Sequence, residues 1–303
     1  MAATVTKLGD DLYLIDAMMH GVPERLACYL FDTPERTLVE CGPSVSIEHL
    51  FAALDEVGVD DVARLVVTHI HLDHAGGAWR LARRFPGARI GVHETGARHL
   101  ASPERLWRSA ARIWGEQGLL DLWGPMEPIA PERLEVVDEG DRLAIGGGRA
   151  IDVVHTPGHA RHHVVFHEAS TGGAFVGDAV GISFPHGHVV QPATPPPDFD
   201  PHLMVDSLRR IGALEPAFLG FAHFGPEPDV DRILAEAERR VGDWVSWVES
   251  VGLEGEALAA GLRAWVLADH RAAGVDEEVV AVFDRTTDWE SQAAGIARWL
   301  ADR

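Results

Sequence analysis

Residues 68–77 read Thr-His-Ile-His-Leu-Asp-His-Ala-Gly-Gly, and this stretch decides the fold. It places three imidazoles and one carboxylate within six residues, directly after the apolar run 64–67, which reads as a buried strand. Side chains of an extended run alternate in direction, so the first two histidines and the aspartate can share one face. Neutral imidazoles and carboxylates are ligands of Zn²⁺, Fe²⁺ and Mn²⁺, so the stretch predicts a metal site at a strand end.

Three further apolar segments end in the same way, at a histidine or an aspartate that lies beside a glycine. The first ends in Val-His-Thr-Pro-Gly-His at 154–159, the second in Phe-Val-Gly-Asp at 175–178, and the third in Phe-Ala-His-Phe-Gly at 221–225. Strand ends of a sandwich bring side chains from distant parts of the chain to one edge. The four segments therefore predict one metal site that is assembled from several strand ends.

The order and spacing of these motifs resemble the metallo-β-lactamase superfamily of hydrolases over about residues 12–227, and in particular its binuclear members with an H-x-H-x-D-H motif. The resemblance implies an α/β fold, a four-layer αββα sandwich. It also implies two divalent metals, with Zn²⁺ favoured and Fe or Mn as alternatives. Carried over residue by residue, the ligands are His69, His71 and His159 for the first metal, Asp73, His74 and His223 for the second, and Asp178 as the bridge.

Two residues are expected to support these ligands from behind. Glu40 ends the apolar run 37–39, at a position where many members of the superfamily carry aspartate, and we expect it to accept a hydrogen bond from a ligand imidazole. The alternative interpretation is that Glu40 lies at a strand end that faces solvent. His163 matches the second histidine of the Thr-Pro-Gly-His-x-x-x-His pattern of the family, which implies a supporting or a pocket role.

Two segments are candidates for the wall of a substrate pocket. Trp107 and Trp114 are seven residues apart, on one face of a helix expected within 96–118, where they belong either to the core or to the pocket. The run 185–201 contains six prolines, which predicts no regular structure. It is either a pocket wall or a stiff surface connector. The remaining pocket candidates are Phe184, directly before this run, and His186 and His188 within it.

The sequence divides into a sandwich domain over residues 1–227 and a helical extension over 228–303. Within the first part we expect a helix over 74–85, another over 202–213, and strands that include 12–16, 27–31 and 173–177. The extension predicts three amphipathic helices, over 229–250, 255–270 and 276–301, with Asp229 and Asp276 as candidate caps. Their apolar faces need a cover, which the sandwich, the other helices or the second subunit of a homodimer can provide.

Composition limits the partners. The formal charge is −21 and the chain has a single lysine, which argues against nucleic acid as a substrate. No apolar run approaches the roughly 20 residues that span a membrane, and the first residues lack a secretory apolar core, so we expect a cytoplasmic enzyme with a small-molecule substrate. Cys28 and Cys41 lie in apolar segments and are expected to be buried hydrophobes without a disulfide.

The resemblance implies hydrolysis by a metal-bridging hydroxide that Asp73 orients, and the favoured substrate is a small thioester, ester or lactone, as for enzymes of the glyoxalase II type. Penicillin cleavage is disfavoured, because the commonest zinc β-lactamases carry a cysteine at the position of Asp178 and an arginine at that of His74. The alternatives are a mononuclear iron dioxygenase of the persulfide type, a phosphodiesterase, and a binding protein that has lost catalysis.

Overall fold

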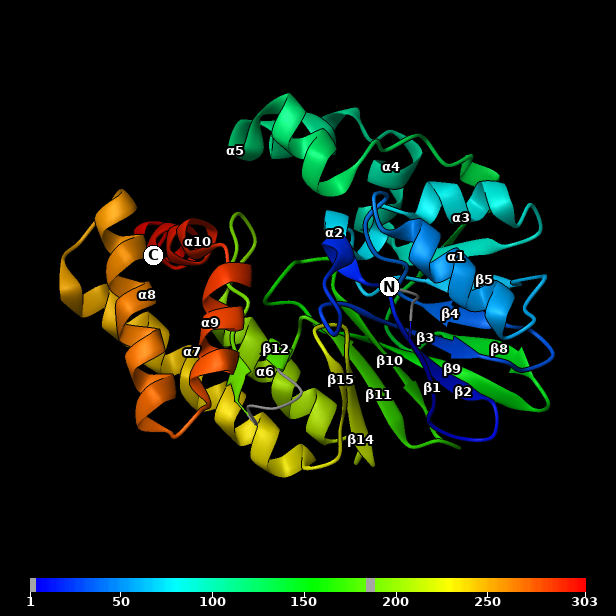
Figure 1. The fold of residues 1–303 in the computed structure, drawn as a ribbon. Helices are drawn as coiled ribbons and strands as arrows, with labels where there is room; N and C mark the ends of the chain where they lie inside the picture. Colours follow the sequence, from blue (N-terminus) through cyan, green and yellow to red (C-terminus); the bar gives the residue numbers. More distant parts are fainter. Residues whose placement is uncertain (1–3, 184–188) are drawn as a thin grey trace.

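The computed structural model describes residues 4–183 and 189–303, and its centre is a pair of β-sheets (Figure 1). Among these residues the first sheet has seven strands in chain order, antiparallel from β1 to β4 and parallel from β4 to β7. They are β1 Val5–Lys7, β2 Leu12–Asp16, β3 Ala27–Phe31, β4 Thr37–Val39, β5 Arg64–Val66, β6 Arg89–His93 and β7 Leu134–Val137.

The second sheet has six strands in the described part of the chain, in the order β15-β14-β11-β10-β9-β8. Its pairs are antiparallel except for β11 and β14, which run parallel. The strands are β8 Arg142–Gly146, β9 Arg149–His155, β10 Val164–Glu168, β11 Gly173–Gly177, β14 Phe218–Phe221 and β15 Gly225–Glu227.

Apolar side chains that alternate along the strands hold the sheets together. In β3, Tyr29 and Phe31 face the second sheet, whereas Cys28 and Leu30 face the helices. The ring of Phe175 in β11 lies between the sheets, with its centre 4.8 Å from that of Tyr29 and 5.3 Å from that of Phe31. Both cysteines are free and buried, as predicted.

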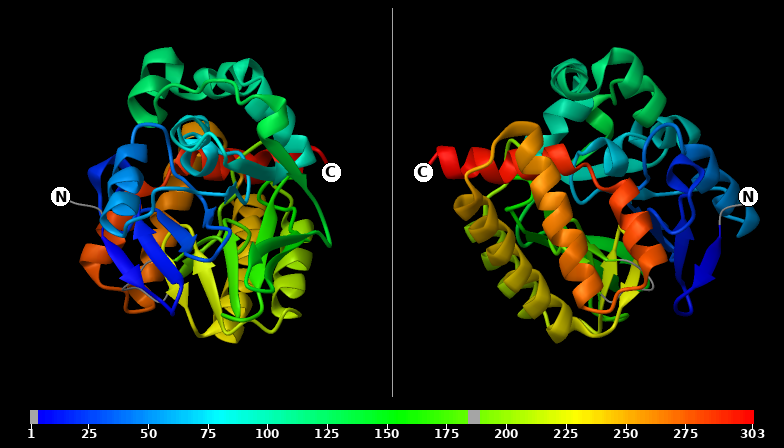
Figure 2. Two further views of the ribbon diagram at one scale, coloured as in Figure 1. Left: turned by 90° about the vertical axis from the view of Figure 1, so that its right-hand side faces the viewer. Right: turned by 60° about the vertical axis from the view of Figure 1, so that its left-hand side comes forward.

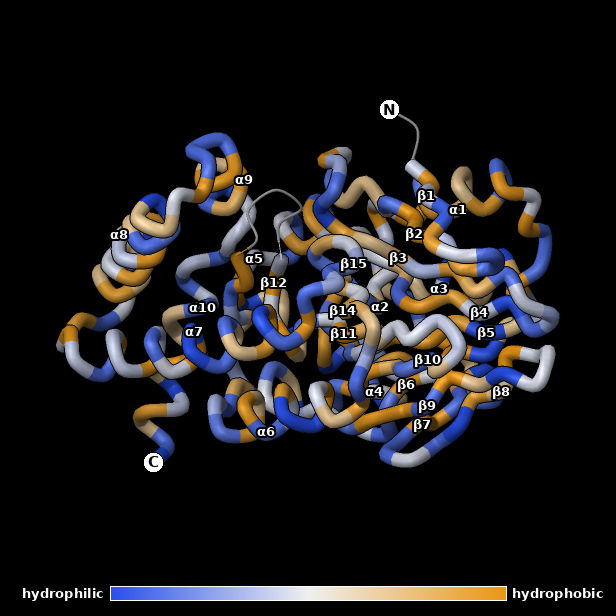
Figure 3. The backbone as a smooth tube through the Cα atoms, turned by 90° about the horizontal axis from the view of Figure 1, so that it is seen from below, coloured by the Kyte–Doolittle hydropathy of each residue, from blue (hydrophilic) through white to orange (hydrophobic). Residues whose placement is uncertain are grey.

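Helices cover the outer face of each sheet, which confirms the predicted four layers (Figure 2). The first sheet is covered by α1 Ile47–Glu56, α3 Ala78–Arg84 and α4 Glu94–Ala101, and the second by α6 Pro201–Gly212 and α7 Val230–Val251. Hydrophobic residues run along the strands β11 and β14, whereas helices such as α8 (Gly255–Ala272) alternate between hydrophobic and hydrophilic (Figure 3). None of the described helices is long and apolar enough to serve as a membrane span.

The predicted helix over 74–85 is instead two helices, α2 Leu72–Ala75 and α3. Two glycines separate them, because the chain passes very close to the loop after β4. The Gly77 amide donates to the Gly42 carbonyl at 2.8 Å, and a Cβ at Gly77 would lie 3.0 Å from that oxygen. A Cβ at Gly76 would lie 2.3 Å from the Leu72 carbonyl oxygen, so both glycines are required for close approach.

The predicted helix over 276–301 is also wrong, because the chain forms α9 Glu277–Thr286 and then α10 Trp289–Ala301. The Asp288 side chain accepts a hydrogen bond from the Ser291 amide at 3.0 Å, which starts a new helix where the pattern suggested continuity. Helices α7 to α10 share one apolar cluster, to which Phe199 and Met204 contribute.

The caps of the other C-terminal helices follow the prediction in part. Asp276 caps α9 by accepting a hydrogen bond from the Glu278 amide at 2.8 Å. The Asp229 side chain makes no capping bond to α7 and pairs instead with Arg232 at 2.8 Å.

The proline-rich run contains a short strand, although its six prolines predict no regular structure. Strand β13 Val190–Gln191 pairs with β12 Ile182–Ser183, since its prolines lie outside the two paired residues. Helix α6 begins at Pro201, and the Asp200 side chain accepts hydrogen bonds from the amides of His202 and Leu203 at 2.9 and 3.1 Å. Helix α5 Glu104–Trp123 bends at Gly115, whose φ is 69°.

Candidate metal centre

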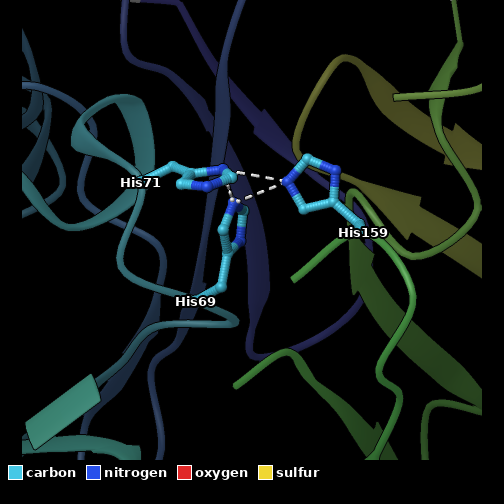
Figure 4. Close-up of side chains that lie close together, drawn as sticks. All are labelled: His69, His71 and His159. Carbon is cyan, nitrogen blue, oxygen red and sulfur yellow. Dashed lines mark hydrogen bonds between the residues drawn. The ribbon is translucent and has the colours of Figure 1, made fainter. Parts of the chain in front are cut away.

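Three imidazoles meet at the edge where both sheets end (Figure 4). The Nε2 atom of His69 lies 2.9 Å from Nδ1 of His71 and 3.2 Å from Nε2 of His159, and the last two nitrogens are 2.9 Å apart. Zn–N bonds of 2.0–2.1 Å in a tetrahedral site place their nitrogens about 3.4 Å apart, so this triangle has nearly the size that zinc requires. Burial holds the pKa of His71 at about 4, so its imidazole is neutral and can ligate.

Local geometry explains why the three rings converge. His69 and His71 follow β5, at the point where the chain turns into α2. His159 follows β9, in a turn that needs Gly158, since a Cβ there would lie 2.4 Å from the Met204 amide nitrogen. The loops after a strand of each sheet therefore supply one ligand set.

A second group of ligands lies beside the first. Nε2 of His223 is 3.4 Å from Oδ2 of Asp73, and Nε2 of His74 is 3.7 Å from the same oxygen. Asp178 lies between the groups: its Oδ1 is 3.3 Å from Nε2 of His74, and its Oδ2 is 3.5 Å from Nε2 of His159. The seven residues predicted as ligands thus come together, and each oxygen of Asp178 faces a different group.

The chemistry of these donors fits divalent cations. Both ring nitrogens of His74 and Oδ1 of Asp178 are buried without a hydrogen-bond partner among the described residues, which is costly unless another group binds them. Burial alone would raise the pKa of Asp73 and Asp178, but the neighbouring imidazoles outweigh it and hold both pKa values below the usual range. Two carboxylates and five imidazoles form a ligand set suited to zinc.

Glu40 lies directly behind this site and not at a solvent-facing strand end, since only 1% of its surface is exposed. Its Oε1 accepts hydrogen bonds from the Thr68 hydroxyl at 2.5 Å and from the Thr68 amide at 3.2 Å, and lies 3.4 Å from Nδ1 of His74. Because the Thr68 hydroxyl donates to Glu40, it accepts from Nδ1 of His69 at 3.0 Å. This arrangement fixes the tautomer of His69 and leaves Nε2 free to ligate.

Other contacts orient the remaining ligands. Nδ1 of His159 is 3.0 Å from the Ala193 carbonyl oxygen, and Nδ1 of His223 is 2.8 Å from the Arg25 carbonyl oxygen. Each of these nitrogens carries the ring proton and donates it, so Nε2 of each ring presents its lone pair to the centre.

His163 acts on Asp178 through the backbone. Nε2 of His163 accepts a hydrogen bond from the Asp178 amide at 3.2 Å, so its Nδ1 carries the proton and donates to the Thr156 hydroxyl at 2.9 Å. The neighbouring His162, which no sequence motif singles out, is buried with its ring centre 6.2 Å from that of His69. Burial and nearby imidazoles hold the pKa of His162 at about 2, and its position after His159 is the one signal that could have drawn attention to it.

The candidate metal centre opens into a cavity of about 300 Å³. Its walls come from the loop after β2, from α5, from the proline-rich segment at 193–197, and from α9 and α10. Trp114 lines the cavity, whereas Trp107 is not among its lining residues and packs in a small cluster with Ala110 and Leu119. Phe184, His186 and His188 fall outside the described residues.

The C-terminal helices form part of this wall, a role that could not be assigned from their sequence. Thr286 of α9 and Gln292 of α10 line the cavity. Gln292 accepts a hydrogen bond from the Thr194 amide at 2.5 Å, which anchors α10 on the proline-rich segment. A Cβ at Gly295 would lie 1.8 Å from the Thr194 carbonyl oxygen, so this helix requires a glycine at the contact.

A separate His/Asp group, formed by His93, Asp138 and His155, does not suit a metal. Nδ1 of His93 accepts a hydrogen bond from the Thr95 amide at 3.2 Å, so Nε2 of the neutral ring carries the proton. The rings of His93 and His155 are stacked, with centres 4.8 Å apart and planes at 14°. A metal ion lies in the plane of each imidazole that binds it. The planes of these two stacked rings are nearly parallel, so no position close to both rings lies in both planes.

Comparison with known proteins agrees with this geometry. The family model described as the metallo-beta-lactamase superfamily matches residues 23–223. The metallo-beta-lactamase fold-containing protein ST1585 of Sulfurisphaera tokodaii is 29% identical over 257 residues, which are 82% of this chain and 91% of that protein. Its crystal structure superposes with a TM-score of 0.66 at 24% identity, over 94% of this chain and 98% of the other, which shows the fold.

Several relatives have the name of an enzyme. Hydroxyacylglutathione hydrolase of Aeromonas salmonicida is 27% identical over 178 residues, which are 58% of this chain and 52% of that protein. Human acyl-coenzyme A thioesterase MBLAC2 is 25% identical over 189 residues, which are 57% of this chain and 64% of that protein. The chain therefore spans about half to two thirds of the length of these two enzymes.

Proposed function

Because this chain belongs to the metallo-β-lactamase superfamily, we propose that it is a binuclear metal-dependent hydrolase of a small carboxylic thioester, ester or lactone. The observation that carries the proposal is the position of Asp178, with one carboxylate oxygen toward each of two ligand groups. His69, His71 and His159 would hold one ion, and Asp73, His74 and His223 the other. Divalent ions bound there acidify a water molecule and polarise a carbonyl oxygen, and zinc is the favoured metal.

Asp73 is the ligand best placed to move a proton. Its contacts with His74 and His223 both use Oδ2, so Oδ1 is available toward the cavity, which Asp73 lines. Its low pKa keeps the carboxylate ionised, so it can accept a hydrogen bond from an attacking water molecule and orient it. The proton can then pass to the leaving group, which matters more for an alkoxide than for a thiolate.

The cavity wall favours an acyl compound with an apolar part. Helix α5 presents Leu106, Ala110 and Ile113 to the cavity, and these side chains can exclude water from an acyl group and hold it beside the metal centre. The names of two relatives, a hydroxyacylglutathione hydrolase and an acyl-coenzyme A thioesterase, favour a thioester among the candidate substrates.

Metal content and substrate screening together test the proposal. Protein purified without added metal should contain about two ions per chain, and His69→Ala should lose at least one of them. His202→Ala changes an exposed histidine of α6 and should keep both. The purified protein should then hydrolyse a hydroxyacyl-glutathione or acyl-coenzyme A thioester faster than a phosphodiester such as bis(4-nitrophenyl) phosphate.

Other results would contradict the proposal in distinct ways. A single iron per chain, with oxygen consumption in the presence of a persulfide, would replace the hydrolase by a dioxygenase. Faster cleavage of the phosphodiester would make the enzyme a phosphodiesterase. Failure to take up any metal, with correct folding shown by circular dichroism, would leave a fold used for binding.

A further inference from the structure

A pinned loop between β2 and β3 reaches the edge of the metal centre. The Asp16 carboxylate accepts hydrogen bonds from the Met18 amide at 2.9 Å and from the Glu24 amide at 2.7 Å, which closes the loop. Met18, His20 and Glu24 all have positive φ, at 48°, 57° and 56°. Such backbone is unfavourable for residues other than glycine and persists where the surroundings enforce it, often at ligand sites.

This loop places Arg25 beside the metal ligands. The Arg25 carbonyl oxygen accepts the hydrogen bond from Nδ1 of His223, so the residue is directly connected to the ligand set. Its side chain lines the cavity, where it is the only arginine or lysine among the described lining residues. In a chain with a formal charge of −21, a single cation at this position is a specific feature of the cavity.

The Arg25 guanidinium has N–H donors that are not used in the contact with His20. Its Nη1 lies 2.8 Å from Nδ1 of His20, and in the described part of the chain no carboxylate lies within 4.0 Å of it. Because Nδ1 of His20 accepts from Arg25, Nε2 of His20 donates to the Leu122 carbonyl oxygen at 2.7 Å. The end of α5 thus holds His20, and His20 holds the arginine in a fixed orientation.

We propose that the Arg25 guanidinium binds an anionic group of the substrate, a carboxylate or a phosphate, beside the metal centre. The inference rests on the proposed hydrolase function and narrows its substrate class to thioesters or esters that carry a negative charge near the scissile bond. A guanidinium has five N–H donors in a planar fork that matches two oxygens of such a group, and only one of them is occupied by His20.

The acidic residues that line the cavity have other contacts and do not form an ion pair with Arg25. Asp73 and Asp178 belong to the metal-ligand groups. Asp288 caps α10 through the Ser291 amide, and Glu24 is engaged in a contact of its own. Burial lowers the pKa of Arg25 and the charge of Asp73 opposes this shift, but among the described residues no carboxylate forms an ion pair with the guanidinium.

Matched pairs of substrates test the proposal by activity. The first pair is 4-nitrophenyl succinate and its neutral methyl ester, which places the charge in the acyl part. The second is S-acetyl-3-mercaptopropanoate and its neutral amide, which places the charge in the leaving group. For at least one pair, kcat/KM of the charged member should fall roughly 10- to 100-fold in Arg25→Gln, mainly through KM, while the neutral member changes less than about threefold.

Two further variants separate binding from structure. Arg25→Lys keeps the charge without the fork and should recover part of the loss. Arg112→Gln removes an exposed arginine of α5 that does not line the cavity, and it should leave both pairs unchanged. Equal losses for charged and neutral members in Arg25→Gln would overturn the proposal, since they would show that Arg25 only holds His223 and the loop.

A binding measurement keeps the test independent of turnover. Isothermal titration of the metal-loaded protein should give tighter binding of succinate than of butanoate, and Arg25→Gln should reduce this difference at least tenfold. If this difference is found but none of the esters is hydrolysed, the anion site stands and the proposed hydrolase function fails. If esters are hydrolysed but Arg25→Gln changes neither the preference for charged over neutral substrates nor that for succinate over butanoate, the hydrolase stands and the anion site is refuted.

Discussion

Replacement of Glu40 by glutamine or alanine tests whether this buried carboxylate supports the metal ligands. Its Oε1 accepts two hydrogen bonds from Thr68 and lies 3.4 Å from Nδ1 of His74. The glutamine variant keeps an acceptor for Thr68 but removes the negative charge beside His74. The alanine variant removes both, and it leaves the Thr68 amide and hydroxyl buried without their acceptor.

The expected magnitudes differ for the two variants. A buried donor left without a partner costs about 1–3 kcal/mol, so two such donors should lower the free energy of unfolding of Glu40→Ala by roughly 2–6 kcal/mol. Glu40→Gln should cost about 1 kcal/mol or less by the same reasoning, since the contact with Thr68 persists. Residues behind the metal ligands typically contribute 10- to 100-fold to metal affinity, so both variants should bind zinc that much more weakly.

Urea unfolding of the chelator-treated proteins measures the first effect, and competition with a chromogenic chelator measures the second. Glu56→Gln, on the exposed end of α1, serves as the matched control and should change neither quantity. The reasoning fails if Glu40→Gln binds zinc within twofold of the wild-type protein. It also fails if the alanine variant unfolds at the same urea concentration as the glutamine variant.

Three further predictions concern acid stability, the cavity wall and metal removal. Burial alone would raise the pKa of Glu168, but hydrogen bonds from Arg149 and Thr171 outweigh it and hold the value at about 2. Because the pKa of Glu168 is lower in the folded protein than its value near 4.5 in the unfolded chain, the ionised carboxylate stabilises the fold. This contribution to the free energy of unfolding is fully present above pH 4.5 and is lost as the pH falls toward 2. This amounts to about 3 kcal/mol at most, so Glu168→Gln should flatten that part of the pH profile of urea unfolding, and an unchanged profile would contradict the assignment. Gly295→Ala should displace α10 from Thr194 and raise KM severalfold without changing metal content, whereas Ala294→Gly, at an exposed neighbour, should not change KM. Removal of the metals with a chelator should lower the thermal midpoint, by the equivalent of about 4 kcal/mol for free metal at a thousand times its dissociation constant, and added zinc should restore it. A chelator that shifts the His69→Ala variant equally would refute this last prediction.

The grouping of the seven candidate ligands could be predicted from the sequence because each lies shortly after an apolar strand, in a segment of a few residues. Such a segment is a local signal, and the edge at which strands end is fixed by the fold. The boundary between α9 and α10 could not be predicted in the same way. Apolar residues at helical spacing lie on both sides of residues 286–288, and the interruption depends on one capping aspartate within this short polar stretch.

Contacts between distant segments could not be predicted from the sequence, for a different reason. Arg25 and Leu122 are brought together by His20, and Gln292 of α10 meets Thr194 only once the chain has folded. Periodicity describes which face of an element is buried, but it does not name the partner against which that face packs. The cavity is built from such contacts, so the residues that line it could be identified only in the structure.

Helix α7 explains how the C-terminal helices can act on a site that lies in the sandwich. Ile233 and Ala237 of this helix pack against the second sheet, whereas Trp244 and Val248 pack in the cluster of C-terminal helices. The two parts of the chain therefore share one continuous helix, and the position of α10 over the cavity depends on the sheet that also supplies Asp178. Because the ligands come from strand ends while the wall comes from helices, substitutions in α10 should alter substrate binding and leave the metals in place.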